Sequence, residues 1–179
     1  TIFNMGRITG CTTLAAVCAP NDEGAVWARA AGEALALDAV AMGLGTCWLT
    51  GTYRKSLVAG ELRADERLLG ILALGIPEKQ EAGEISRKRK TLEKLCKGDT
   101  SLWPEEVRQA AELVRQAPSA MNGQPWRMTL DGNGFEIAAP ARSALDLGIG
   151  LCHAELGLKT PHTWKLTREG HGFAALARV

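Results

Sequence analysis

The sequence has no excess of charge of either sign. Its 179 residues include 21 lysines and arginines against 20 aspartates and glutamates. A nucleic-acid-binding protein presents clustered positive charge well beyond such a balance, so we expect no nucleic-acid partner. The length is sufficient for one compact domain with its own hydrophobic core.

Cysteine pairs at metal-binding or redox spacing are also lacking. The five cysteines are an odd number and include no Cys-x-x-Cys pair. The sequence therefore indicates neither a disulfide framework nor a zinc site, and we expect no bound metal. Unpaired cysteines suit a reducing compartment, so we expect a cytoplasmic protein.

The apolar run at residues 8–19 is too short to cross a membrane, because a spanning helix needs about 20 apolar residues. Arg7 and the later Cys18 give this run some features of a lipoprotein signal. Val17 is unfavourable immediately before such a cysteine, so we interpret the run as a buried strand. No Gly-x-Gly-x-x-Gly loop follows a strand, which argues against a Rossmann site for a nicotinamide.

Hydrophobic periodicity and turn residues predict alternating helices and strands. Asn21 is typical of a helix start, Gly43 of a helix end, and Pro104 of a first helical position. The sequence Asp131-Gly132-Asn133-Gly134 is a strong hairpin signal. We expect helices near residues 22–42, 54–61, 104–116 and 143–158, and strands near 8–19, 46–49, 68–74, 127–130, 135–138, 164–167 and 172–179. This pattern indicates an α+β fold with several antiparallel pairs.

Some side chains have an expected structural role. Ser143 and Asp146 have the spacing of a capping box at a helix start. We expect His153 to be a packing histidine and Cys47 a small buried side chain. Two apolar helix faces are expected, made of Val26, Ala30, Ala34, Leu37 and Ala41, and of Val107, Ala110, Ala111 and Val114.

Between Pro118 and Pro125 the chain has three hydrogen-bonding side chains, those of Ser119, Asn122 and Gln124. Each proline fixes its own φ and disfavours helix at the preceding residue, so these side chains lie on a stiffened, non-helical backbone. A hydroxyl and two carboxamides can each donate and accept, which suits a flat heteroaromatic ligand better than a phosphate. An ordinary connection would explain the prolines but not three spaced polar side chains.

This segment resembles the Pro-Ser-x-x-Asn-x-Gln-Pro signature of the FMN-dependent nitroreductase family. A second block, residues 32–51, resembles the helix-to-loop segment that lies against the flavin ring in that family. A third, residues 87–93, resembles its basic phosphate-binding segment, with Thr91 where proline is usual. The resemblance implies a nitroreductase-like α+β fold with a central, mostly antiparallel sheet flanked by helices.

The resemblance also implies how FMN is bound. The segment from Pro118 to Pro125, named the Pro-Ser loop, would contact the ribityl hydroxyls and ring carbonyls. The backbone near Gly51 would face the flavin N5. Arg87 and Arg89 would bind the phosphate. The implied cofactor-binding residues are Trp48, Leu49, Thr50, Gly51, Arg87, Arg89, Pro118, Ser119, Asn122 and Gln124. For residues 32–51 the alternative is a helix cap followed by a turn. For the basic residues 87–90 the alternative is a solvated run of charges.

The order of the blocks resembles a subgroup in which one chain carries two nitroreductase-like halves. We therefore expect a single domain over residues 1–179, with halves at about 1–98 and 99–179, forming an intrachain pseudo-dimer or a homodimer. The family usually opens with an Arg-rich, phosphate-binding stretch that is not seen before the first strand. Because the chain begins at Thr1 rather than Met, we expect an N-terminal segment to be missing.

The function implied is an FMN-dependent oxidoreductase. It would transfer hydride from NAD(P)H through flavin N5 to a small-molecule acceptor such as a nitroaromatic or a quinone. The sequence offers no convincing side-chain acid or nucleophile, and this chemistry requires none. The alternative is a non-catalytic flavin-binding or interaction protein derived from the same fold.

Overall fold

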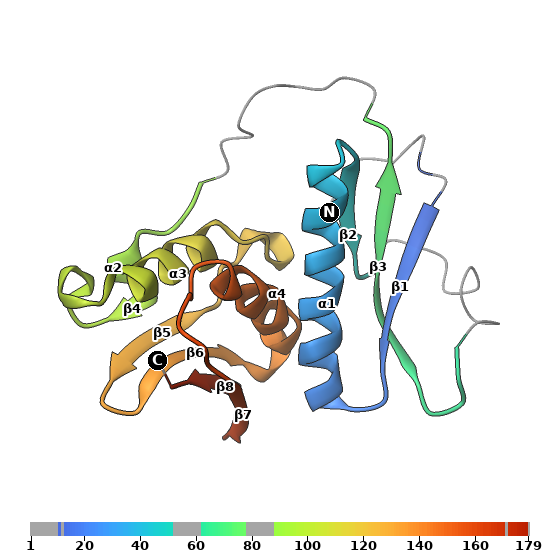
Figure 1. Ribbon diagram of the computed structural model, residues 1–179. Coiled ribbons are helices and arrows are strands. Elements are labelled where there is room, and N and C mark those ends of the chain that lie inside the picture. Colours follow the sequence, from blue (N-terminus) through green and yellow to red (C-terminus); the bar gives the residue numbers. More distant parts are fainter. Residues whose placement is uncertain (1–10, 12, 52–61, 78–87, 171, 179) are drawn as a thin grey trace, which may run out of the picture.

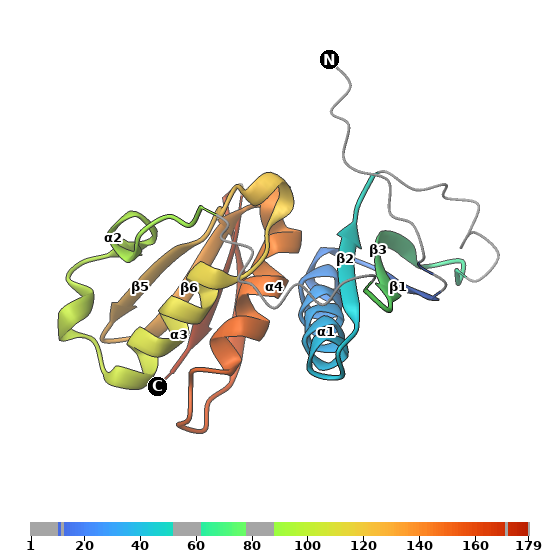
Figure 2. The same cartoon turned by 90° about the horizontal axis from the view of Figure 1, so that it is seen from above.

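The computed structural model describes residues 11, 13–51, 62–77, 88–170 and 172–178. In this part of the chain the strands form two sheets, a three-stranded sheet ordered β1-β3-β2 and a five-stranded sheet ordered β4-β5-β6-β8-β7. The long helices α1 and α4 pack against each other between the two sheets (Figures 1 and 2).

The first sheet contains β1 (Thr13–Ala19), β3 (Arg67–Gly75) and β2 (Gly45–Leu49). Both outer strands run antiparallel to β3. The central strand is the continuous apolar run expected at residues 68–74, and the middle of it is buried. The helix expected at residues 54–61 lies outside the described residues.

Helix α1 (Asp22–Ala41) begins where expected, since the Asn21 side chain accepts a hydrogen bond of 2.7 Å from the Gly24 N–H. The apolar face expected for it is wrong in part, because Ala34 and Ala41 are exposed. The helix packs on the sheet on one side and on α4 on another, so its buried residues spread over a wider arc. They are Ala25, Val26, Arg29, Gly32, Glu33, Ala36 and Ala39.

The second sheet contains β4 (Cys96–Lys97), β5 (Arg127–Asp131), β6 (Gly134–Pro140), β8 (Gly172–Ala177) and β7 (Trp164–Glu169). The two expected hairpins, β5–β6 and β7–β8, are confirmed. Strand β4 was not expected. It pairs parallel to β5, so the segment that leaves the first sheet crosses over to the second.

Two helices cover the second sheet. In α3 (Glu105–Gln116) the expected apolar stripe is confirmed, with all four of its residues fully buried. Helix α4 (Ala144–Glu155) packs between α3 and α1. Glycines permit both contacts. A Cβ at Gly157 would lie 2.5 Å from the Cα of Ala110, and one at Gly148 would lie 2.1 Å from the carbonyl oxygen of Val26.

Short elements complete the described fold: α2 (Leu92–Leu95), η2 (Thr100–Leu102), η3 (Ala120–Asn122) and η4 (Ala141–Ser143). The expected α+β class with mostly antiparallel strands is confirmed. The strands divide between two sheets because α1 and α4, packed together, separate them. No helix in the described residues has the length and apolarity to cross a membrane.

All five cysteines are free thiols. Cys47 is exposed on β2, so the expectation that it is buried is wrong. The neighbouring Trp48 points toward α1, and side chains alternate along a strand, which places Cys47 on the opposite face of the sheet. Within the described part of the chain, no group of three His, Cys, Asp or Glu side chains has the arrangement of a metal site.

Candidate functional site

The loop between α3 and β5 has an unusual backbone. Met121, Asn122 and Gln124 have φ values of 52°, 53° and 46°. This left-handed region costs about 1 kcal/mol or more for methionine and glutamine, and less for asparagine, which adopts it more readily. Such a conformation persists only where surrounding contacts hold it, and it is concentrated at binding and active sites.

Contacts within the loop and from α4 hold this conformation. The Ser119 hydroxyl accepts a hydrogen bond of 2.9 Å from the Gln124 N–H. The Asp146 carboxylate accepts one of 3.0 Å from the Ala120 N–H, and its backbone carbonyl accepts one of 2.9 Å from the Trp126 indole. Asp146 therefore fixes both ends of the loop.

The capping box expected at the start of α4 is therefore wrong. Ser143 precedes the helix but makes no side-chain capping bond. The Asp146 carboxylate instead accepts the hydrogen bond from the Ala120 N–H in the Pro-Ser loop. Burial raises the pKa of Asp146 above its usual value, although the Ala120 hydrogen bond and the positive charge of Arg29 oppose that rise.

The basic segment, residues 88–90 of the described chain, docks onto the same loop. Arg89 donates one hydrogen bond of 2.7 Å to the Asn122 Oδ1 and another of 2.7 Å to the Gln116 carbonyl. The Asn122 amide donates in turn to the Lys88 carbonyl at 2.9 Å. Two blocks more than thirty residues apart in the sequence thus meet, while Arg87 lies outside the described residues.

Gln124 makes a second set of contacts with this segment. It is 4 % exposed, and its Oε1 accepts a hydrogen bond of 2.7 Å from the Lys90 N–H. Its amide donates to the Asn122 carbonyl at 3.0 Å. The carboxamides of Asn122 and Gln124 therefore bind the basic segment, whereas the Ser119 hydroxyl still has a hydrogen with which it can donate.

The second sequence block ends at the end of β2. The Trp48 indole donates a hydrogen bond of 2.7 Å to the Glu33 carboxylate, and the Arg29 guanidinium lies over its ring at 4.7 Å from the ring centre. The side chain of Trp48 is thus directed toward α1. Beyond it, Thr50 and Gly51 are exposed, and a Cβ added at Gly51 would meet none of the described residues within 4 Å.

A buried polar cluster connects α1 with α4. The second carboxylate oxygen of Glu33 lies 2.9 Å from Nε2 of His153, and both residues are less than 10 % exposed. Arg29 is also buried and donates to the Leu69 carbonyl at 2.7 Å. His153 is the packing residue that was expected, whereas the burial of Arg29 and Glu33 was not expected. Their signal was weak, namely two opposite charges at i and i+4 in an alanine-rich helix.

The two segments predicted to bind the flavin are the Pro-Ser loop and the end of β2, and we call them the two walls of the site. Both lie on the same side of the α1–α4 pair. Figure 2 shows η3 of the Pro-Ser loop and the end of β2 toward the upper edge of the view, with the helix pair below and between them. Each wall is anchored to that pair, one through Asp146 on α4 and the other through Glu33 on α1.

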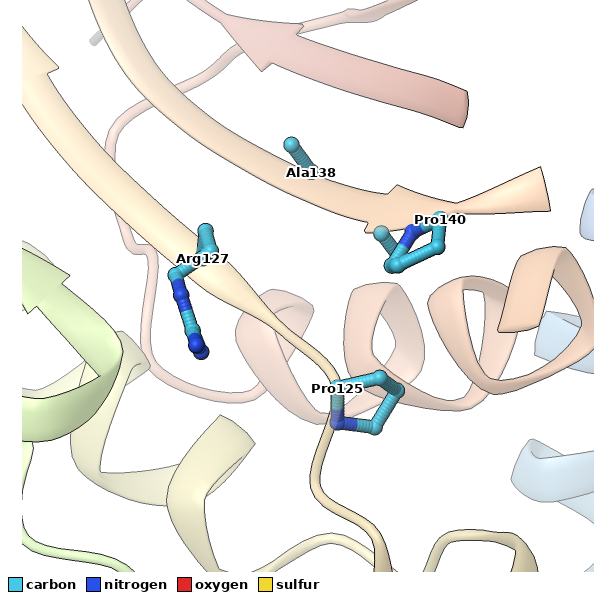
Figure 3. Close-up of a pocket in the computed structure, with 5 residues that line it drawn as sticks. Pro125, Arg127, Ala138 and Pro140 are labelled. Atoms are coloured by element: carbon cyan, nitrogen blue, oxygen red, sulfur yellow. The ribbon is translucent and has the colours of Figure 1, made fainter. Parts of the chain in front are cut away.

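A small hollow follows the Pro-Ser loop. It has a volume of about 200 Å³ and is lined by Pro125 and Arg127, with Ala138, Ala139 and Pro140 on β6 (Figure 3). A pocket for a ligand of drug size occupies roughly 300–1,000 Å³, so this hollow is too small to enclose a flavin. A larger hollow of about 320 Å³ at the start of α1 is lined by Asp22, Glu23 and Arg168 among others. Its two carboxylates are unsuited to a phosphate, and the Arg168 guanidinium lies 3.9 Å from the Asp22 carboxylate.

Comparison with known proteins agrees with the fold and the motifs. The structure is similar to the crystal structure of a putative nitroreductase from Thermotoga maritima, with a TM-score of 0.69 and 21 % sequence identity, over 97 % of this chain and 80 % of that chain. No match was found among curated proteins. Residues 20–158 match the family described as "Putative TM nitroreductase". The fold is therefore nitroreductase-like, and the chain belongs to this nitroreductase family.

Proposed function

We propose that the protein is an FMN-dependent oxidoreductase of the nitroreductase type. It would take hydride from NAD(P)H and pass it to a nitroaromatic, a quinone or a similar small acceptor. The observation that carries this proposal is the position of two sequence blocks, the Pro-Ser loop and the end of β2, on one side of the α1–α4 pair (Figure 2). Family membership supports an oxidoreductase role.

The described residues fit a flavin at this place. Among the described residues nothing lies within 4 Å of a Cβ placed at Gly51, and the absence of a Cβ there would let a planar ring approach the backbone closely. Ser119 can donate from its hydroxyl, and the strained loop presents its backbone in a fixed conformation. Lys88 and Arg89 bring positive charge that suits a phosphate.

The residues have distinct proposed tasks. FMN, when bound, would supply the hydride-transfer chemistry. The backbone of Thr50 and Gly51 would face the reactive edge of the ring, and Ser119 would bind a ring or ribityl oxygen. Asn122 and Gln124 would act by fixing the basic segment, since their carboxamides bind it in the structure. Pro118, Trp48 and Leu49 would shape the two walls, and Arg87 would add a second phosphate contact.

We also propose that the chain forms an intrachain pseudo-dimer. Two sheets, each with its own long helix, support this organisation. The pairing of β4 with β5 supports a crossover close to the proposed boundary near residue 98. Each half would then contribute one wall of a single flavin site.

Turnover tests the proposed activity. The purified protein, supplied with FMN, is mixed with NADPH or NADH without oxygen, and flavin reduction is followed by the loss of its visible absorption. A nitroaromatic or quinone is then added, and reoxidation is measured. We expect both steps. Bound FMN that neither nicotinamide reduces would refute the enzymatic proposal and support the non-catalytic flavin-binding alternative.

A further inference from the structure

Helix α4 carries two buried polar side chains on the same face. Asp146 and His153 are seven residues apart, which is close to two helical turns and places them about 10 Å apart along the axis. Asp146 is 7 % exposed and His153 is 8 % exposed. Buried polar groups of this kind are costly unless each has a hydrogen-bonding partner.

The partners of these two side chains belong to opposite walls of the proposed site. Asp146 accepts the hydrogen bond from the Ala120 N–H in the Pro-Ser loop. His153 contacts the Glu33 carboxylate, whose other oxygen accepts the hydrogen bond from Trp48 at the end of β2. One rigid helix is therefore connected to both walls, directly on one side and through Glu33 on the other.

The surroundings leave these connections little freedom. The close approach of α1 and α4 at Gly148 prevents the helices from sliding, because backbone atoms are already in contact there. The Trp48 ring is held by Arg29 over one face and lies against Gly32, where a Cβ would come within 2.5 Å of its Cη2 atom. We therefore expect a substitution at Asp146 to disturb the Pro-Ser loop but not the end of β2, and a substitution at His153 to do the opposite.

We propose that Asp146 and His153 are positioning residues that set the spacing between the two walls. They touch neither the cofactor nor a substrate. They act through Ala120 and through Glu33 and Trp48, respectively. This inference rests on the proposed flavin site, but its structural part, one anchor for each wall, can be tested without FMN.

The first test measures FMN affinity in variants of the full chain. D146A and H153F remove the anchoring atoms, and we expect each to raise the FMN dissociation constant roughly tenfold, the effect of losing one hydrogen bond to a buried group. D146N keeps an oxygen for the Ala120 N–H and H153Q keeps a donor for Glu33, so each should restore affinity to within about threefold of wild type.

His162 offers a matched control. It makes a comparable contact of 3.0 Å with the Glu155 carboxylate, but the loop it fixes belongs to neither wall. H162Q should leave FMN affinity unchanged. If D146A and H153F both bind FMN as tightly as wild type, or if H162Q weakens binding equally, the positioning role is refuted.

The second test uses backbone hydrogen exchange without FMN. D146A should speed exchange at Ala120 and leave the amides that pair β2 with β3 unchanged, and H153F should do the reverse. Equal acceleration across α3 and β6 in either variant would indicate general destabilisation and overturn the inference. If wild type binds no FMN, the proposed function fails, and the exchange pattern alone then decides whether each residue anchors its wall.

Discussion

The contact between α1 and α4 at Gly148 yields a sharp prediction. In the G148A variant the added Cβ would lie 2.1 Å from the Val26 carbonyl oxygen and 2.8 Å from the Arg29 Cβ. Ordinary contact begins near 3.4 Å, so the helices must separate locally by roughly 1.3 Å. A backbone carbonyl cannot rotate away as a flexible side chain can.

The energetic cost follows from two opposing effects. Overpacking a tight interface typically costs about 1–3 kcal/mol, and a clash with backbone belongs to the upper part of that range. Alanine in place of glycine within a helix regains about 1 kcal/mol. Separation would also stretch the contact of 2.9 Å between Glu33 and His153. We expect a net loss of about 2 kcal/mol in the free energy of unfolding.

Urea unfolding followed by far-ultraviolet circular dichroism would measure this loss. Gly24 in the first turn of α1 is a control, because an added Cβ there would meet first the Asn21 side chain at 3.2 Å, with no backbone atom among its nearest neighbours. G24A should remain within about 0.5 kcal/mol of wild type. A G148A variant as stable as wild type would contradict the close crossing of the two helices and the packing argument built on it.

Further predictions concern the loops. Met121 is 72 % exposed at φ 52°, so M121G should raise the free energy of unfolding by up to about 1 kcal/mol in the same urea assay; a loss would contradict the assigned strain. Q124A removes the buried acceptor of the Lys90 N–H and should lower that energy by about 1–3 kcal/mol; an unchanged midpoint would show that the contact is dispensable. Burial acts to lower the pKa of His162, but the Thr160 carbonyl and the Glu155 carboxylate together raise it above 6.5. Because the folded state holds the proton more tightly, this contribution to stability is complete below pH 6.5 and is lost as the pH rises through the folded pKa. Urea unfolding midpoints should fall less steeply in H162Q than in wild type as the pH rises above 6.5. Identical slopes would contradict the stabilising role of protonated His162.

Local signals predicted much of the fold because their causes are local. The Asn21 cap, the turn at residues 131–134 and the apolar stripe of α3 depend on residues only a few positions apart, and each was confirmed. The expected face of α1 failed because that helix has two packing partners. An apolar pattern cannot indicate that Arg29 and Glu33 are buried when the groups that satisfy them come from remote segments.

The candidate site was predictable only in outline. The motif blocks predicted that the Pro-Ser loop and the end of β2 take part in a flavin site, and the family match spans both segments. The sequence could not show that Asn122 and Gln124 bind the basic segment, since their partners lie about 34 residues away. For the same reason the sequence indicated a helix cap at Asp146, although the Asp146 carboxylate binds the Ala120 N–H, 26 residues earlier.

The dissociation constant for FMN tests the central claim most directly. It would be measured by quenching of flavin fluorescence for wild type, G51L and G132L. A Cβ at either glycine meets no described residue within 4 Å, but only Gly51 borders the proposed site, whereas Gly132 lies in the β5–β6 turn. We predict that wild type and G132L bind FMN alike and that G51L binds much more weakly. No binding by wild type, or equal binding by all three, would contradict it.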